Sequence, residues 1–124
     1  MSALARVETV PWGGLAQGRE TTTWAVRVVG EIDLSNAREV IDDVSGALPH
    51  DTPRVVLDLS TTAYVDSAAI AGLFRLAERV QQRRQQLQVV VPLHSPIRKV
   101  IELTGLDQLV PVLDTLDAID GPGS

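Results

Sequence analysis

Short apolar runs that alternate with amphipathic helical segments constrain the fold of this chain more than any other feature. Residues 54–59 (RVVLDL) and 87–91 (LQVVV) are nearly continuous apolar runs, as expected of strands covered on both faces. Between them, a helix that begins near Ser67 carries apolar side chains at helical spacing, namely Ile70, Leu73, Phe74, Ala77 and Val80. Strands and helices that alternate in this way imply crossover connections and a largely parallel sheet. The sequence therefore predicts an α/β fold.

The rest of the chain extends this alternation on both sides. Further strands are expected at residues 4–10, 22–29 and 110–113. Further helices are expected from an N-cap at Ser35 to Leu48, from Ser95-Pro96 to Gly105, and as one or two turns at residues 115–120. A break is expected at residues 11–14 (PWGG), a loop at residues 18–21 and a polar turn at residues 60–62. We predict one domain over residues 1–120 and a tail at 121–124, with a mixed, largely parallel sheet of four to five strands, an antiparallel first edge strand and about four helices.

Composition excludes several classes of function. The absence of cysteine excludes a disulfide scaffold, a thiolate zinc site, an iron–sulfur cluster and a cysteine nucleophile. A net charge of −5 and an aromatic content of 3% argue against capture of nucleic acid or of an anionic membrane. There is no apolar run long enough to span a bilayer and no signal-peptide pattern, so a cytoplasmic protein is expected.

Catalytic signatures are also missing from the sequence. It contains no GxxxxGK(S/T), GxGxxG, GxSxG or HExxH motif, and His50 and His94 stand in separate loops. We therefore expect no enzyme activity, no catalytic residue, no cofactor and no metal.

Three aspartates, Asp33, Asp58 and Asp66, stand near expected strand ends. They could hold Mg²⁺ as in a phosphate-receiver domain, but the only lysine, Lys99, falls inside a helix rather than after a late strand. The favoured interpretation is that the aspartates cap loops and keep the rim of the sheet soluble.

One helix face is basic. Arg75, Arg79 and Arg83 follow at a spacing of four residues, with Arg84 beside them. This stripe is either a solvated face, partly neutralised by Glu78, or a docking edge for an acidic partner, because arginine is enriched at interfaces. Nucleic acid ranks third because of the net charge.

The sequence Asp66-Ser67-Ala68-Ala69-Ile70 lies between a strand and an amphipathic helix. Ser67 could be a plain N-cap, worth about 1 kcal/mol. Alternatively, its hydroxyl is open to a kinase, since a helix N-terminus tolerates a phosphate whereas a bound partner would have to desolvate it.

The order of these motifs resembles the STAS domain of bacterial anti-sigma factor antagonists, over about residues 24–119. The motifs that carry the resemblance are residues 30–33 (GEID), 55–59 (VVLDL), 64–67 (YVDS), 95–106 (SPIRKVIELTGL) and 116–119 (LDAI). The resemblance implies a STAS-like sandwich. It also implies that the unmodified protein binds an anti-sigma factor with serine kinase activity. This kinase phosphorylates Ser67, the phosphorylated protein is released, and a serine phosphatase of the metal-dependent type resets it.

The same resemblance places the partner-binding surface at Asp33, Asp66, Ser67, Ala68, Ala69, Ile70 and Arg75. The family commonly reads Asp-Ser-Ser-Gly-Leu at residues 66–70, so Ala69 replaces a glycine here, and we expect its methyl group to meet a partner backbone. Two alternatives stay open. One is a STAS scaffold or transport-complex subunit in which Ser67 is only a cap, and the other is an enzyme of the receiver or hydrolase type.

Overall fold

The computed structural model describes residues 4–16 and 19–116. Within these residues, the order of strands and helices is β1 (Ala5–Ala16), β2 (Arg19–Ile32), α1 (Ala37–Ala47), β3 (Arg54–Asp58), β4 (Thr62–Val65), α2 (Ser67–Gln82), β5 (Gln86–Val90), α3 (Arg98–Thr104), α4 (Leu106–Leu109) and β6 (Val112–Leu113). Among them, no helix is long and apolar enough to cross a membrane.

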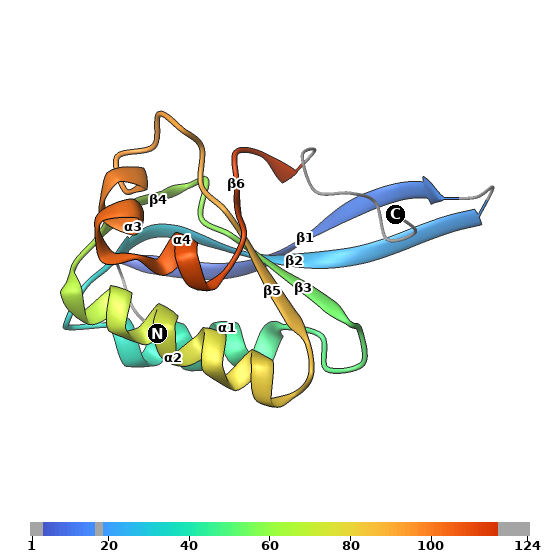
Figure 1. The fold of residues 1–124 in the computed structure, drawn as a ribbon, viewed down its shortest axis with the longest axis horizontal. Coiled ribbons are helices and arrows are strands. Elements are labelled where there is room, and N and C mark those ends of the chain that lie inside the picture. Colours follow the sequence, from blue (N-terminus) through green and yellow to red (C-terminus); the bar gives the residue numbers. More distant parts are fainter. Residues whose placement is uncertain (1–3, 17–18, 117–124) are drawn as a thin grey trace.

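All the strands belong to one mixed sheet of the order β1-β2-β3-β5-β6, and β4 pairs with β2 away from this path. β1 and β2 form a long antiparallel hairpin, and the other pairings are parallel (Figure 1). β2 serves two neighbours: its middle pairs with β3 at Ala25–Arg27, and its end pairs with β4 after a register shift between Gly30 and Glu31. The predicted α/β fold with an antiparallel first edge strand is confirmed, and the described part of the sheet has six strands.

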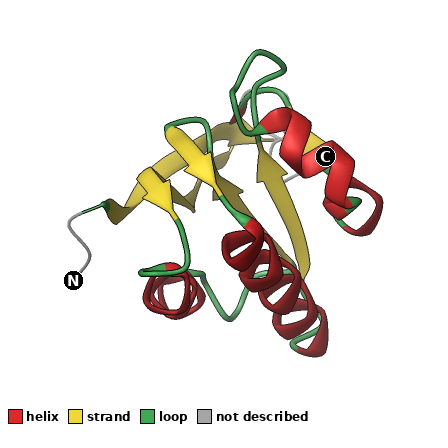
Figure 2. Cartoon of the chain, turned by 90° about the vertical axis from the view of Figure 1, so that its left-hand side faces the viewer, coloured by secondary structure: helices red, strands yellow, loops and turns green. Residues whose placement is uncertain are grey.

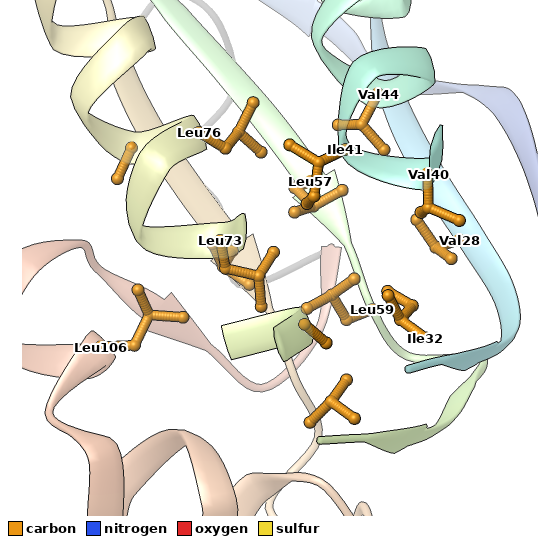
Figure 3. Close-up of a cluster of buried hydrophobic side chains, with 14 of the residues drawn as sticks. Val28, Ile32, Val40, Ile41, Val44, Leu57, Leu59, Leu73, Leu76 and Leu106 are labelled. Carbon is orange, nitrogen blue, oxygen red and sulfur yellow. The ribbon is translucent and has the colours of Figure 1, made fainter. Parts of the chain in front are cut away.

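The core lies between the sheet and the helices. α1 and α2 run side by side under the sheet, with α3 and α4 beyond α2 (Figures 1 and 2). Apolar residues of both long helices meet the strands, among them Val40, Ile41 and Val44 of α1 and Leu73 and Leu76 of α2 (Figure 3). Each such fully buried side chain stabilises the fold by about 1.5–3 kcal/mol. This packing fixes where both helices begin, and therefore where the loops before them lie.

The other face of the sheet is partly apolar and partly charged. Ala25, Val56 and Val90 form a small second cluster there. Beside it, the Arg27 Nε donates to Asp58 Oδ2 at 2.9 Å, although the Asp58 side chain is only 1% exposed. The ion pair compensates the desolvation that burial imposes on this carboxylate.

The β1–β2 hairpin is longer than the sequence predicted. The predicted break at residues 11–14 and the loop at 18–21 are wrong within the described residues, because β1 continues through Pro11 to Ala16 and β2 begins at Arg19. Proline is tolerated in an edge strand where its missing N–H would face away from the ladder.

Helix ends and short elements differ by a few residues. The N-cap of α1 is Asn36 rather than Ser35, and α3 begins at Arg98 after a turn in which Ser95 Oγ accepts from the Ile97 N–H at 3.3 Å. Gly105 ends α3 with φ +81°, as predicted. The final strand is shorter than expected, α4 precedes it, and most of the helical turn predicted at residues 115–120 lies outside the described residues.

Candidate functional site

The candidate site lies where β2 and β4 end beside one another. Ile32 pairs with Val65 in this parallel register, so the loop that follows β2 and the residue that follows β4 are neighbours. The Asp66 N–H donates to Ile32 O at 3.3 Å and ties the two strand ends together. Figure 2 shows this end of the sheet, from which α1 and α2 run away from the viewer.

Asp66 organises the site through both carboxylate oxygens. It is the N-cap of α2, where its Oδ1 accepts from the Ala69 N–H at 2.9 Å. Its Oδ2 accepts from the Leu34 N–H, also at 2.9 Å. A single side chain therefore fixes the start of α2 and the position of the loop between β2 and α1.

Ser67 is the first residue of α2 and is exposed. Its hydroxyl makes no hydrogen bond within the described part of the chain, because Asp66 already provides the cap. The interpretation of Ser67 as the N-cap is wrong. The prediction that this residue opens the second helix in contact with water is confirmed.

The loop before α1 is held by its own polar groups. Asp33 Oδ1 accepts from both the backbone N–H and the hydroxyl of Ser35. Asn36 Oδ1 accepts from the Asp33 N–H at 2.8 Å, and Asn36 Nδ2 donates to Glu31 O at 2.9 Å. The loop presents Leu34 outward, with 81% of its surface exposed. The exposure of Leu34 could not be predicted from the sequence, because nothing local distinguishes an exposed leucine from a core one.

Two residues of the predicted partner-binding surface belong to the core instead. Ala69 is 0% and Ile70 5% exposed, so their assignment as surface contacts is wrong. The α2 stripe that faces the sheet begins at these residues, and the Ala69 methyl group therefore packs inward rather than against a partner. Ala68 is half-buried, and Arg75 is exposed two turns along α2.

The arginine stripe of α2 faces α1 in part. Arg79 Nη1 lies 3.7 Å from Asp42 Oδ1, and Arg83 Nη2 donates to Ser45 Oγ at 3.4 Å. Arg75 and Arg79 also line a polar groove with Arg38, Ile41 and Asp42. The stripe is thus neither a fully solvated face nor an open docking edge: Arg75 and Arg84 are exposed, whereas Arg79 and Arg83 are half-buried against α1.

The three aspartates do not form a metal site. Asp58 pairs with Arg27, while Asp33 and Asp66 bind backbone N–H groups of loops and of a helix start. Within the described residues, no three His, Cys, Asp or Glu side chains lie close enough to hold a metal ion. The interpretation of these residues as loop and helix caps is confirmed for Asp33 and Asp66, and also for Asp58, whose Oδ1 accepts from the Ser60 N–H at 2.9 Å. The expectation that Asp58 also keeps the rim of the sheet soluble is wrong, because this side chain is buried in its ion pair with Arg27.

The mixed sheet, with the described helices packed against it, has the fold of solved anti-sigma factor antagonists. The family described as "Mlab, STAS domain" matches residues 15–111, and the chain belongs to this family. BtrV of Bordetella bronchiseptica, which is named as an anti-sigma factor antagonist, is 27% identical over 89 residues, or 72% of this chain and 76% of that protein.

Solved structures give the same result. The crystal structure of an anti-sigma factor antagonist from Mycobacterium paratuberculosis has a TM-score of 0.65 and 26% identity, and the match covers 89% of each chain. A Thermotoga maritima structure carrying the same kind of name has a TM-score of 0.62 at 21% identity, covers 75% of this chain and 81% of the other, and supports the fold.

Proposed function

We propose that this protein is an anti-sigma factor antagonist controlled by phosphorylation of Ser67. In this proposal, the unmodified protein binds an anti-sigma factor with serine kinase activity, and the phosphorylated protein is released. The observation that carries the proposal is the exposure of Ser67 at the first position of α2, with the capping role taken by Asp66. The names of the relatives support the same partner class.

The fold tolerates a phosphate at this position. The first N–H groups of a helix have no partner within it, and the helix dipole favours a negative charge there by about 0.3–1 kcal/mol. Asp66 takes the Ala69 N–H, and the first turn of α2 contains no acidic residue. The N–H groups of Ser67 and Ala68 can therefore face a phosphate on Ser67 without loss of the cap.

A partner docked over the site would not tolerate the same phosphate. The docking surface consists of Leu34 as an apolar contact, with Asp33, Asp66, Ser67 and Ala68 around it and Arg75 further along α2. A phosphate adds up to two charges beside Asp66, and burial of an unpaired charge costs several kcal/mol. The modification therefore acts on binding much more than on folding.

The chemistry of the switch comes from the partners. The anti-sigma factor kinase brings ATP and Mg²⁺, and a serine phosphatase of the metal-dependent type removes the phosphate. In this scheme the chain itself needs no cofactor, no metal and no catalytic residue; it supplies the hydroxyl and the surface around it.

Binding of the cognate anti-sigma factor by Ser67 variants tests the proposal. We expect Ser67→Ala to bind like the unmodified protein and to resist release by ATP. Ser67→Asp should fold normally and bind at least about thirtyfold more weakly, which corresponds to about 2 kcal/mol. Gln82→Glu, which adds one negative charge at the exposed far end of α2, is the matched control and should bind normally. Equal affinity of Ser67→Asp and the unmodified protein would favour a STAS scaffold without switching.

A further inference from the structure

The outer edge of β1 is the long free edge of this sheet. β1 has 12 residues, whereas the strand at the opposite edge, β6, has only two. Within the described residues, β1 pairs with β2 on one side and with no strand on the other. An exposed edge of this length presents unpaired N–H and C=O groups on which another strand can form.

The backbone of β1 and β2 identifies which groups face outward. The Glu31 N–H donates to Leu4 O at 2.9 Å, while the Gly30 N–H points away from β1, to Thr61 O at 3.1 Å. In an antiparallel strand, the backbone N–H and C=O groups point alternately toward the partner strand and away from it. Every second residue after Leu4 therefore forms its backbone hydrogen bonds with β2. The residues in between direct their backbone groups to the free edge; they are Ala5, Val7, Thr9 and Pro11, and Pro11 contributes only its carbonyl.

A groove of about 410 Å³ runs beneath this edge, between β1 and α1. Its lining is Ala5, Arg6, Val7, Glu39, Val40, Asp43 and Ala47. The floor is apolar, and Glu39 and Asp43 stand one turn apart on the flank of α1 that faces the groove. Arg6, the cation of this lining, pairs with Glu8 at 3.2 Å. Asp43 is exposed and has no ion pair within the described residues, in contrast to Asp42 on the opposite flank, which meets Arg79.

We propose that the free edge of β1 binds an extended, basic segment of a partner protein as an added strand. Side chains of such a strand that lie opposite Val7, and two residues to either side, point into the groove. The central one is apolar and covers the floor, and the outer ones are lysine or arginine and meet Glu39 and Asp43. This surface does not include Ser67, so the proposal goes beyond the switch.

A second copy of this chain fits the same edge poorly. Twofold pairing of two β1 strands would bring two α1 helices to the same side of the joined sheet. The carboxylates of Glu39 and Asp43 would then face their own counterparts. Like charges placed opposite one another destabilise an interface, and each chain already carries a net charge of −5.

NMR titration of the labelled protein with acetyl-Lys-Thr-Val-Thr-Lys-amide tests the proposal. We expect the amide signals of Ala5, Val7 and Thr9 to shift and to gain protection from hydrogen exchange at about 1 mM peptide. The same peptide with glutamate in place of each lysine should bind about tenfold more weakly. No shift along β1, equal affinity for both peptides, or dimerisation through β1 would overturn the proposal.

Two variants distinguish the contribution of the backbone hydrogen bonds of β1 from that of the carboxylates on α1. Val7→Pro removes the central outward N–H and should abolish the shifts. Asp43→Lys lies on exposed helix surface and should weaken binding of the basic peptide about threefold to tenfold without affecting the fold. Unchanged affinity in Asp43→Lys would contradict the proposal even if Val7→Pro does not fold. Ser67→Asp should bind the peptide normally, so a failure here is distinguishable from a failure of the switch.

Discussion

Replacement of Asp66 by alanine should destabilise the protein by about 2–3 kcal/mol. The change removes the N-cap of α2, which is typically worth about 1 kcal/mol, and leaves the Ala69 N–H without its acceptor. The change also removes the hydrogen bond from the Leu34 N–H to the Asp66 carboxylate. A hydrogen bond to a charged acceptor contributes about 1.5 kcal/mol. Asp66→Asn keeps one acceptor oxygen and should cost about half as much.

Urea unfolding followed by circular dichroism measures this difference. The midpoint should fall while the slope with urea stays constant, since the surface exposed on unfolding is unchanged. Asp43→Ala, which changes an exposed aspartate without a capping role, is the control and should stay within about 0.5 kcal/mol of the parent. If Asp66→Ala were as stable as Asp43→Ala, Asp66 would not hold the site together as described.

Two further pairs of variants test the packing. A Cβ at Gly72 would lie 2.7 Å from the Ile41 Cγ1, so Gly72→Ala should destabilise the protein by about 1–2 kcal/mol in thermal unfolding. A Cβ at Gly46 would meet nothing within 4 Å, so Gly46→Ala should stabilise α1 by up to about 1 kcal/mol. Arg27→Met leaves the buried Asp58 carboxylate without its cation and should lower the free energy of unfolding by about 3–5 kcal/mol, measured in urea. The double change Arg27→Met with Asp58→Leu should recover most of that loss. If stability were not recovered, the broken ion pair would not be its cause.

Sequence patterns predicted the parts of the fold that depend on local periodicity. The apolar stripe of α2 and the continuous runs of β3 and β5 each required burial on one or both faces, and the structure places them there. The position of the candidate site was predictable for the same reason: Asp66 follows a strand, Ser67 begins the next helix, and residues at such a junction lie at the rim of a parallel sheet.

Features that depend on pairing partners were not predictable in this way. β4 has only four residues, and its strand conformation comes from pairing with the distant end of β2 beyond the register shift at Gly30. Proline interrupts most strands, because it cannot donate a backbone hydrogen bond. Pro11 is tolerated within β1 because the N–H that it lacks would face outward, away from β2. The burial of Ala69 and the exposure of Leu34 follow from the rotation of α2 and the shape of the Asp33–Asn36 turn, both set by tertiary contacts.

In the proposed function, the hydroxyl group of Ser67 controls binding of the anti-sigma factor. Protein isolated from its own host can be separated into a fraction bound to the anti-sigma factor and a free fraction, and each can be analysed by intact mass and peptide mapping. We expect one phosphate, on Ser67, in the free fraction and none in the bound fraction. Equal phosphorylation of both fractions, or a phosphate only on Ser60, Thr61 or Thr62, would contradict it.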